Sequence, residues 1–110
     1  MKREMNKRKS QTSVRIIGGT LKRSKVKVLD HDGLRPTPDR VRETLFNWLM
    51  PTLPGANVID CFAGSGVLGL EALSRGAARC TFIEKDGAVA DQLQKNLDRF
   101  QLTSQAVVKQ

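Results

Sequence analysis

Residues 58–69 constrain the fold of this chain more than any other segment, and they read Val-Ile-Asp-Cys-Phe-Ala-Gly-Ser-Gly-Val-Leu-Gly. The segment is typical of an apolar strand that ends at Asp60, followed by a tight glycine turn and a helix that begins near Val67. Glycine at positions 64 and 66 allows a positive φ and lets a ligand approach main-chain atoms that a Cβ would shield. The start of the helix presents unpaired N–H groups to the same space. Because open α/β sheets bind ligands at the carboxyl ends of their strands, this segment predicts a small-molecule site.

Two classes of ligand fit this glycine turn. Gly64, Gly66 and Gly69 satisfy the dinucleotide pattern G-x-G-x-x-G. Glu84 follows 20 residues after Gly64, as an acid that binds a ribose should. Asp60 argues against a dinucleotide, because its carboxylate would repel a pyrophosphate by several kcal/mol at an effective dielectric constant of about 20. S-adenosylmethionine carries a sulfonium and an ammonium but no phosphate, so a methyl donor is favoured and a dinucleotide remains the alternative.

The size and composition predict one small globular domain. The chain has 110 residues, of which 39% are hydrophobic, and no stretch approaches the roughly 18 apolar residues that a membrane span needs. The basic N-terminus does not precede the apolar segment of a secretory signal, so we expect a cytoplasmic protein without a membrane partner. Cys61 and Cys80 are expected to be buried packing residues and His31 a loop residue, which leaves no metal site.

The positive charge is concentrated in the first quarter of the chain. Residues 1–28 contain ten lysines and arginines against one acidic residue, whereas the remainder contains nine basic and ten acidic residues. For the first nine residues, a solvated tail and a polyanion-binding arm are equally compatible with this composition. Farther along, the basic residues alternate with Val14, Ile16, Val26 and Val28. This alternation favours a hairpin with one basic face that neutralises phosphates.

The alternation of strand and helix patterns divides the chain into a disordered basic tail (1–12), a basic β-hairpin with its loop (13–34) and an α/β domain (35–110). The expected strands cover residues 13–17, 25–29, 57–61, 80–84 and 105–109, and the expected helices cover 38–50, 67–74 and, with Asp86 as cap, the segment to about Phe100. In the first helix Thr37 is expected to be the N-cap. The apolar residues at helical spacing predict its core face: Val41, Leu45, Trp48 and Leu49.

Three segments together resemble one protein family. Residues 35–47 read Arg-Pro-Thr-Pro-Asp-Arg-Val-Arg-Glu-Thr-Leu-Phe-Asn, residues 60–66 read Asp-Cys-Phe-Ala-Gly-Ser-Gly, and residues 15–19 read Arg-Ile-Ile-Gly-Gly. On these motifs the chain resembles, from about Val14 to Leu102, the N-terminal part of the RsmD-type methyltransferases. Those bacterial enzymes methylate the exocyclic N2 of a guanine in 16S ribosomal RNA within the assembled small subunit.

The resemblance implies a Rossmann-like class I S-adenosylmethionine-dependent methyltransferase fold, truncated after about three strands, with residues 35–110 as a partial methyltransferase domain that binds the donor. It implies that Asp60 lies near the donor ammonium and that Glu84 accepts hydrogen bonds from the ribose. Thr37 and Arg40 would close over the donor carboxylate, and Asp86 would lie near the adenine edge. The implied donor-binding residues are Asp60, Phe62, Ala63, Gly64, Ser65, Gly66, Glu84, Asp86, Thr37 and Arg40.

The resemblance also implies ribosomal RNA, free or in the assembled small subunit, as the partner, and a monomer for the full-length protein. The expected RNA contacts are Arg15, Lys22, Arg23, Lys25 and Arg35. The turn of the hairpin departs from the family, because Leu21, Arg23 and Ser24 stand where the family has an aromatic residue, a glycine and an arginine.

The base pocket of this family uses an Asp- or Asn-Pro-Pro-aromatic motif after the fourth strand. The chain has no Pro-Pro pair and ends at Gln110, in or just after the third expected parallel strand. Its catalytic residues are therefore unknown, and we expect these 110 residues alone to be marginally stable and to transfer no methyl group. A catalytically silent RNA-binding module and a fragment of a nucleotide-dependent oxidoreductase are the alternatives.

Overall fold

The structure is a computed structural model that describes residues 11–29, 38–61 and 63–110. An antiparallel hairpin comprises β1 (Gln11–Arg15) and β2 (Lys25–Leu29), and a parallel sheet comprises β3 (Asn57–Asp60), β4 (Arg79–Ile83) and β5 (Ala106–Lys109) in that order. The helices are α2 (Asp39–Leu49), α3 (Val67–Ser74) and α4 (Gly87–Arg99), with 3₁₀ turns at Met50–Thr52 and Thr103–Gln105. The expected α/β architecture with a parallel sheet and an N-terminal hairpin is confirmed.

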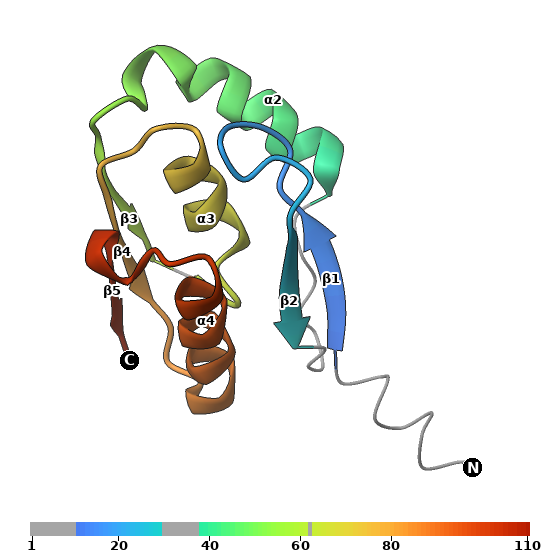
Figure 1. Ribbon diagram of the computed structural model, residues 1–110, viewed down its shortest axis with the longest axis vertical. Helices are drawn as coiled ribbons and strands as arrows, with labels where there is room; N and C mark the ends of the chain where they lie inside the picture. The colour runs from blue at the N-terminus through green and yellow to red at the C-terminus, as the bar shows by residue number, and fades with distance from the viewer. Residues whose placement is uncertain (1–10, 30–37, 62) are drawn as a thin grey trace.

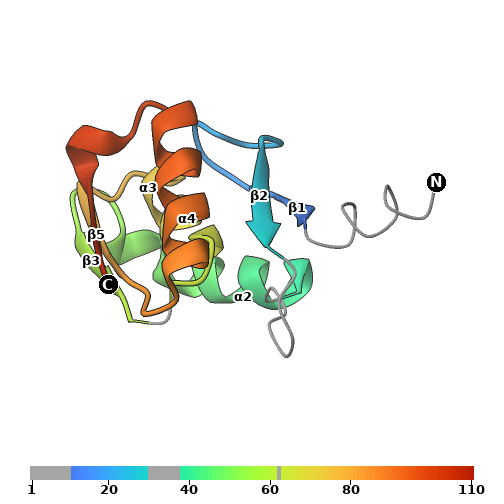
Figure 2. The ribbon, with the colours of Figure 1, turned by 90° about the horizontal axis from the view of Figure 1, so that it is seen from below.

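The elements are arranged in layers. In both views α3 and α4 lie between the parallel sheet and the hairpin, and α2 runs across one end of this arrangement (Figures 1 and 2). Ile16 and Val26 from the hairpin segment belong to the same buried cluster as Leu70 of α3, Phe82 of β4 and Leu93 of α4. The hairpin therefore shares one core with the α/β elements, while the boundaries of the three expected parts stay a prediction.

The two central helices, α3 and α4, are stabilised in different ways. The Asp86 side chain caps α4 by accepting a hydrogen bond from the Val89 N–H at 3.1 Å, as the sequence predicts. The buried residues of α4 include Val89, Leu93 and Leu97, which recur every four positions along one face. In α3 all residues except Leu68 are buried, because this helix contacts the hairpin segment on one side and the parallel sheet on the other.

Helix α2 differs from the sequence-based expectation in the face that it buries. Its buried residues are Arg42 and Phe46, whereas Val41 is 54% exposed and Trp48 is 77% exposed. The prediction that Trp48 belongs to the core is therefore wrong. The physical reason is that Arg42 meets a buried carboxylate on α3 and that the Phe46 ring lies 5.4 Å from the Arg75 guanidinium carbon, so these contacts fix the rotation of the helix.

Several element boundaries shift by one or two residues. Strand β1 covers residues 11–15 rather than 13–17, because Ile16 enters the core and the Ile17 N–H donates to a side chain on α3. Helix α2 begins at Asp39 with Pro38 at the N-cap, no side chain of the described residues caps it, and Thr37 lies outside these residues. Pro51 lies in the 3₁₀ turn that follows α2, which confirms that the helix ends before this proline.

One face of the parallel sheet is covered by α3 and α4, and the opposite face is open among the described residues. Ile59 and Val107 both pair with Thr81 and are 66% and 45% exposed on this open face. An exposed apolar row on a short sheet fits the expectation of marginal stability, which stays a prediction.

Candidate functional site

The predicted glycine turn joins the carboxyl end of β3 to the start of α3. Asp60 is the last residue of β3, Gly64 and Gly66 have φ angles of +57° and +93°, and α3 begins at Val67. The expectation of positive φ at both glycines is confirmed. Because α3 begins where β3 ends, the N–H groups of its first turn lie at the carboxyl end of the sheet, and among the described residues no side chain caps them. This end of the sheet therefore combines a carboxylate, a bare main-chain turn and a helix N-terminus.

Glu84 connects the glycine turn to the next strand. It follows β4 directly, and its Oε1 accepts a hydrogen bond from the Gly64 N–H at 2.8 Å. Its Oε2 accepts a hydrogen bond from the Asp86 N–H at 3.0 Å. One carboxylate thus holds together the turn after β3 and the turn after β4. Gly64 and Glu84, which the sequence analysis selected for their spacing of 20 residues, therefore meet at one edge of the sheet.

Ala63 and Ser65 of the turn form hydrogen bonds with β4, the hairpin and α4. The Ala63 N–H donates to the Ile83 carbonyl at 3.0 Å, and the buried Ser65 hydroxyl accepts a hydrogen bond from the Leu29 N–H at 3.3 Å. The Ser65 carbonyl accepts a hydrogen bond from the Asn96 side chain at 3.0 Å. Ser65 therefore faces the hairpin and α4, and its predicted contact with a ligand stays a prediction.

The other predicted donor-binding residues are placed less completely. Arg40 is exposed in the first turn of α2, and Asp86 is exposed while one of its oxygens caps α4. Thr37 and Phe62 lie outside the described residues, as does Arg35 among the predicted RNA contacts. The structure thus brings together Asp60, Gly64, Gly66 and Glu84 at the carboxyl ends of β3 and β4.

The hairpin has a basic outer face. Register pairs Arg15 with Lys25 and Ser13 with Lys27, so these side chains share one side of the hairpin and all four residues are exposed. The alternating positions Val14 and Val26 pair on the opposite side, where Val26 is fully buried. Lys22 and Arg23 are exposed in the connecting turn. The predicted alternation of basic and apolar residues is confirmed, and RNA contact stays a prediction.

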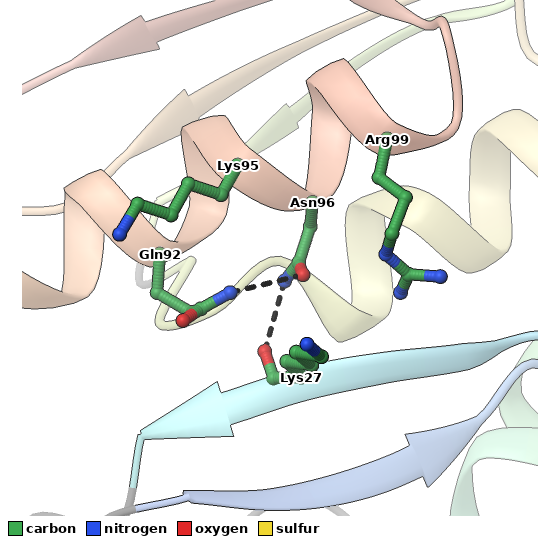
Figure 3. A pocket seen from close by; sticks show the side chains of 5 residues that line it. All are labelled: Lys27, Gln92, Lys95, Asn96 and Arg99. Carbon is green, nitrogen blue, oxygen red and sulfur yellow. Dashed lines mark hydrogen bonds between the residues drawn. The ribbon is translucent and has the colours of Figure 1, made fainter.

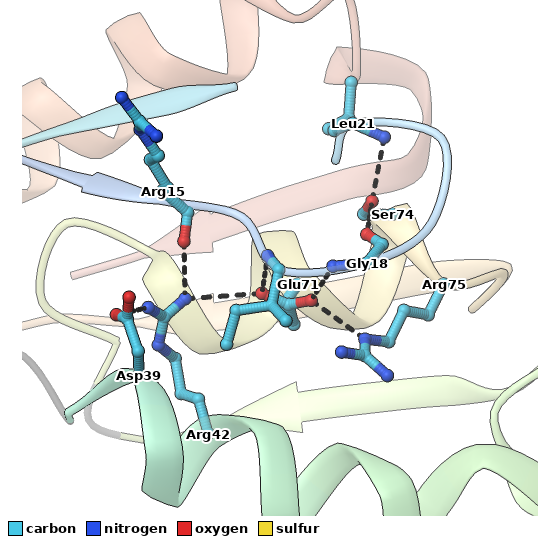
Figure 4. A network of polar contacts seen from close by, with 9 residues as sticks. Arg15, Gly18, Leu21, Asp39, Arg42, Glu71, Ser74 and Arg75 are labelled. Atoms are coloured by element: carbon cyan, nitrogen blue, oxygen red, sulfur yellow. Dashed lines mark hydrogen bonds and ion pairs between the residues drawn. The ribbon is translucent and has the colours of Figure 1, made fainter. Parts of the chain in front are cut away.

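A buried ionic network that the sequence analysis missed ties this hairpin segment to α3 (Figure 4). The carboxylate of Glu71, which has no exposed side-chain surface, accepts hydrogen bonds from the Ile17 and Gly18 N–H groups at 3.0 and 2.9 Å. It also accepts from Arg42 at 3.3 Å and from Arg75 at 2.8 Å. The signal in the sequence was a single acid inside the otherwise apolar helix 67–74, because a buried carboxylate requires cationic or N–H partners.

Arg42 extends the network to two further segments. Its guanidinium donates to the Arg15 carbonyl at 2.9 Å and forms an ion pair with Asp39 one turn earlier in α2. Glu71 and Arg42 therefore fix β1, the start of α2 and the middle of α3 relative to one another. This network positions the basic hairpin beside the helix that begins at the glycine turn.

The two cysteines differ from the expectation that both are buried. Cys80 is buried, but Cys61 is exposed immediately after β3, because the strand ends at Asp60 and the chain turns there. Burial, with a further contribution from the negative charge of Asp60, raises the pKa of the Cys80 thiol from 9.0 to about 12. Among the described residues no cluster of three or more histidine, cysteine or acidic side chains could hold a metal ion.

We predict that one thiol per folded chain reacts with Ellman's reagent at pH 8 and that the second reacts only after unfolding. The reason is that the Cys80 thiolate, the reactive form, would be populated on the order of one part in ten thousand at this pH. Cys61→Ser should abolish the fast reaction. Two equally fast thiols in the folded chain would contradict the prediction.

The same pKa shift predicts how stability depends on pH. Because folding raises the pKa of Cys80, this thiol leaves the free energy of unfolding unchanged below about pH 9 and lowers it as the pH rises from 9.0 toward about 12.

None of the helices within the described residues is long and apolar enough to cross a membrane.

Comparison with known proteins places the chain among methyltransferases. The family described as "Conserved hypothetical protein 95" matches residues 14–110. The chain is 64% identical over 84 residues to ribosomal RNA small subunit methyltransferase D of Escherichia coli K12, covering 76% of this chain and 42% of that protein. The chain thus spans about half the length of the curated relatives that it matches.

Solved structures show the same fold. The methyltransferase yhhF of Escherichia coli superposes with a TM-score of 0.79 at 52% identity, over 89% of this chain and 52% of that one. P. horikoshii TYW2, solved in complex with MeSAdo, superposes with a TM-score of 0.66 at 25% identity, over 91% of this chain and 35% of that one. The architecture is therefore the Rossmann-like fold of class I methyltransferases. The family match over residues 14–110 and the identity to methyltransferase D show that the chain belongs to the RsmD family.

Proposed function

We propose that this chain binds S-adenosylmethionine as the donor half of an enzyme that methylates a guanine N2 in small-subunit ribosomal RNA. The observation that carries the proposal is the edge formed by the carboxyl ends of β3 and β4, where Asp60, the Gly64–Gly66 turn and Glu84 meet. Relatives named as ribosomal RNA methyltransferases support the reaction class, and the relative solved with MeSAdo supports an adenosine-containing ligand.

The charges of the site fit a sulfonium donor better than a dinucleotide. Asp60 and Glu84 place two carboxylates at the ends of neighbouring strands, and their field attracts an ammonium or sulfonium and repels a pyrophosphate. The bare turn at Gly64 and Gly66 offers main-chain contacts, and the first turn of α3 offers N–H groups to the donor carboxylate. Glu84 would exchange its hydrogen bond from Gly64 for those of ribose hydroxyls.

The chemistry follows from donor geometry. In an in-line displacement the guanine amine attacks the sulfonium methyl, and the leaving group is S-adenosylhomocysteine. The residues of this chain would contribute by holding the donor in one orientation, so that catalysis is mainly positioning of the two reactants. An accessible base must enter a pocket as well. Because the family's Pro-Pro-aromatic motif does not occur in these residues, we expect them to bind donor without transferring the methyl group to RNA.

Calorimetry tests the donor site directly. We expect S-adenosylhomocysteine to bind the chain and NAD to give no binding heat at the same concentrations. Glu84→Gln should weaken S-adenosylhomocysteine binding by about 10- to 100-fold, because hydrogen bonds to a charged acceptor contribute about 1.5–3 kcal/mol. Asp98→Asn, an exposed acid toward the end of α4, is the matched control and should bind like the unchanged chain.

Two results would contradict the proposal. NAD binding in place of S-adenosylhomocysteine would favour the oxidoreductase alternative, and equal effects of the Glu84 and Asp98 substitutions would remove Glu84 from the donor site. Turnover of ribosomal subunits or naked RNA with labelled donor would overturn the expected lack of activity.

A second candidate function is a catalytically silent RNA-binding module. The exposed face formed by Arg15, Lys25 and Lys27 favours it, because this surface does not depend on the glycine turn. Salt-dependent RNA binding without any S-adenosylhomocysteine binding would select this candidate over the first.

A further inference from the structure

A hollow of about 210 Å³ lies between β2 and α4, on the hairpin side of the helix (Figure 3). It is lined by one residue of β2 and four of α4: Lys27, Gln92, Lys95, Asn96 and Arg99. The four α4 residues recur at spacings of three and four positions, so they form one stripe of the helix. Among the described residues that line it, three side chains are cationic and none is acidic.

The floor of the hollow is polar and fixed. Gln92 and Asn96 are 6% and 1% exposed, and the Gln92 amide donates to the Asn96 Oδ1 at 3.2 Å. The Asn96 Nδ2 donates to the Lys27 carbonyl at 2.9 Å and to the Ser65 carbonyl at 3.0 Å. Because these contacts commit both hydrogens of the Asn96 amide, the floor is held in place by the fold rather than by solvent.

The rim of the hollow gathers positive charge. The Arg99 guanidinium donates to the Lys25 carbonyl and lies 4.3 Å above the centroid of the Phe100 ring, which restrains it beside β2. Lys27 and Lys95 are exposed. The ion pairs that the structure shows among the described residues involve Arg42 and Arg75, so the three rim cations are left without a carboxylate partner there.

The rim continues the basic face of the hairpin. Lys25 and Lys27 point to the same side of β2, and Arg15 pairs with Lys25 across the hairpin. Lys95 and Arg99 extend this surface from the strand onto the neighbouring helix. A restrained guanidinium and two exposed lysines around a polar hollow are suited to the oxygens of a phosphate, since the fork of arginine matches two oxygens and lysine supplies a point charge.

We propose that this hollow binds a backbone phosphate of RNA and extends the RNA-binding surface from the hairpin onto α4. The inference rests on the proposed function, because it names a contact with the same substrate. It adds Lys95 and Arg99 of α4 to that surface, next to Lys27 of the hairpin. Since a phosphate contact is independent of base identity, these residues set affinity and orientation rather than sequence preference.

The test is a salt titration of RNA binding by the full 110-residue chain, with a labelled fragment of small-subunit ribosomal RNA. Lys95→Gln/Arg99→Gln should make the slope of log K against log[salt] shallower by about 0.7–0.9 for each phosphate that the protein no longer neutralises. Lys95→Gln alone, at an exposed residue, should show the same change in direction if the double variant is poorly folded. Arg79→Gln/Lys109→Gln removes the same charge from exposed positions on β4 and β5 and should leave the slope unchanged.

The outcomes separate this inference from the proposed function. If the slope of log K against log[salt] is unchanged in both variants of the hollow, or changes equally in the control variant, the phosphate site is overturned. Calorimetry with S-adenosylhomocysteine on the same samples reports separately whether the donor site binds its ligand. A few millimolar inorganic phosphate at constant ionic strength should weaken RNA binding by the unchanged chain and not by the variants, whereas phosphate binding that depends on Lys95 and Arg99 but leaves RNA affinity unchanged would assign the hollow to free phosphate and overturn the RNA assignment. RNA binding without salt dependence would overturn it as well.

Discussion

Replacing Glu71 with alanine is expected to lower the free energy of unfolding by about 3–5 kcal/mol, because removing one partner leaves buried charge uncompensated. The substitution takes one carboxylate away from four donors at once: the Ile17 and Gly18 N–H groups and the Arg42 and Arg75 guanidiniums. Arg42 has no exposed side-chain surface, so its charge stays shielded from bulk water when this acceptor is removed. Urea unfolding followed by circular dichroism measures the effect.

The control for Glu71 is Glu43→Ala, which removes an exposed acid from α2 and should change the free energy of unfolding by less than about 0.5 kcal/mol. Similar losses for both variants would contradict the assigned role of the network. Amide hydrogen exchange adds a local readout, because the Ile17 and Gly18 N–H groups should lose protection in Glu71→Ala even under conditions in which the chain stays folded.

Replacing Gly19 with alanine is expected to lower the free energy of unfolding by about 2–5 kcal/mol, from left-handed backbone strain of about 1–2 kcal/mol and overpacking of about 1–3 kcal/mol. Gly19 has a φ of +83°, and a Cβ there would overlap the Ser74 carbonyl oxygen and approach the Ser74 Oγ to 2.6 Å. The same Ser74 carbonyl accepts the Thr20 N–H at 2.8 Å, so relief of the clash would break the contact between the hairpin turn and α3.

Gly55→Ala separates strain from overlap. Gly55 also has a positive φ, +75°, but a Cβ there would meet no atom of the described residues within 4 Å. Its alanine variant should therefore lose only the backbone contribution of about 1–2 kcal/mol. Equal losses of stability at the two positions in urea unfolding would show that the approach of Gly19 to Ser74 does not matter.

The sequence predicts the elements whose signal is local. The glycine turn, the Asp86 cap, the end of α2 before Pro51 and the alternation in the hairpin each depend on residues that are neighbours in the chain, and the structure confirms them. The core face of α2 could not be predicted in this way. Its apolar stripe indicates Val41 and Trp48, but the rotation of the helix is set by Glu71, 29 residues after Arg42.

The contacts of the candidate site and of the hollow also differ in whether the sequence could predict them. The pairing of Gly64 with Glu84 is visible in a spacing of 20 residues, because a βαβ unit brings two strand ends together at a predictable separation. The hollow between β2 and α4 is not visible in the sequence, because Lys27 and Asn96 are 69 residues apart and meet only when the hairpin packs on the helix. Lysines and arginines at helical spacing are typical of any solvated helix face until a second element encloses them.

The Asn96 amide has a mechanical consequence for the molecule. A single nitrogen atom supports both the middle of β2, through Lys27, and the glycine turn, through Ser65. Each main-chain segment accepts its own hydrogen bond, but both bonds come from the same donor atom. If a ligand in the hollow beside Lys27 changes the affinity for a ligand at the glycine turn, linkage requires the second ligand to change the affinity of the first by the same factor. Such coupling would require no hinge motion, because both hydrogen bonds come from one planar side-chain amide.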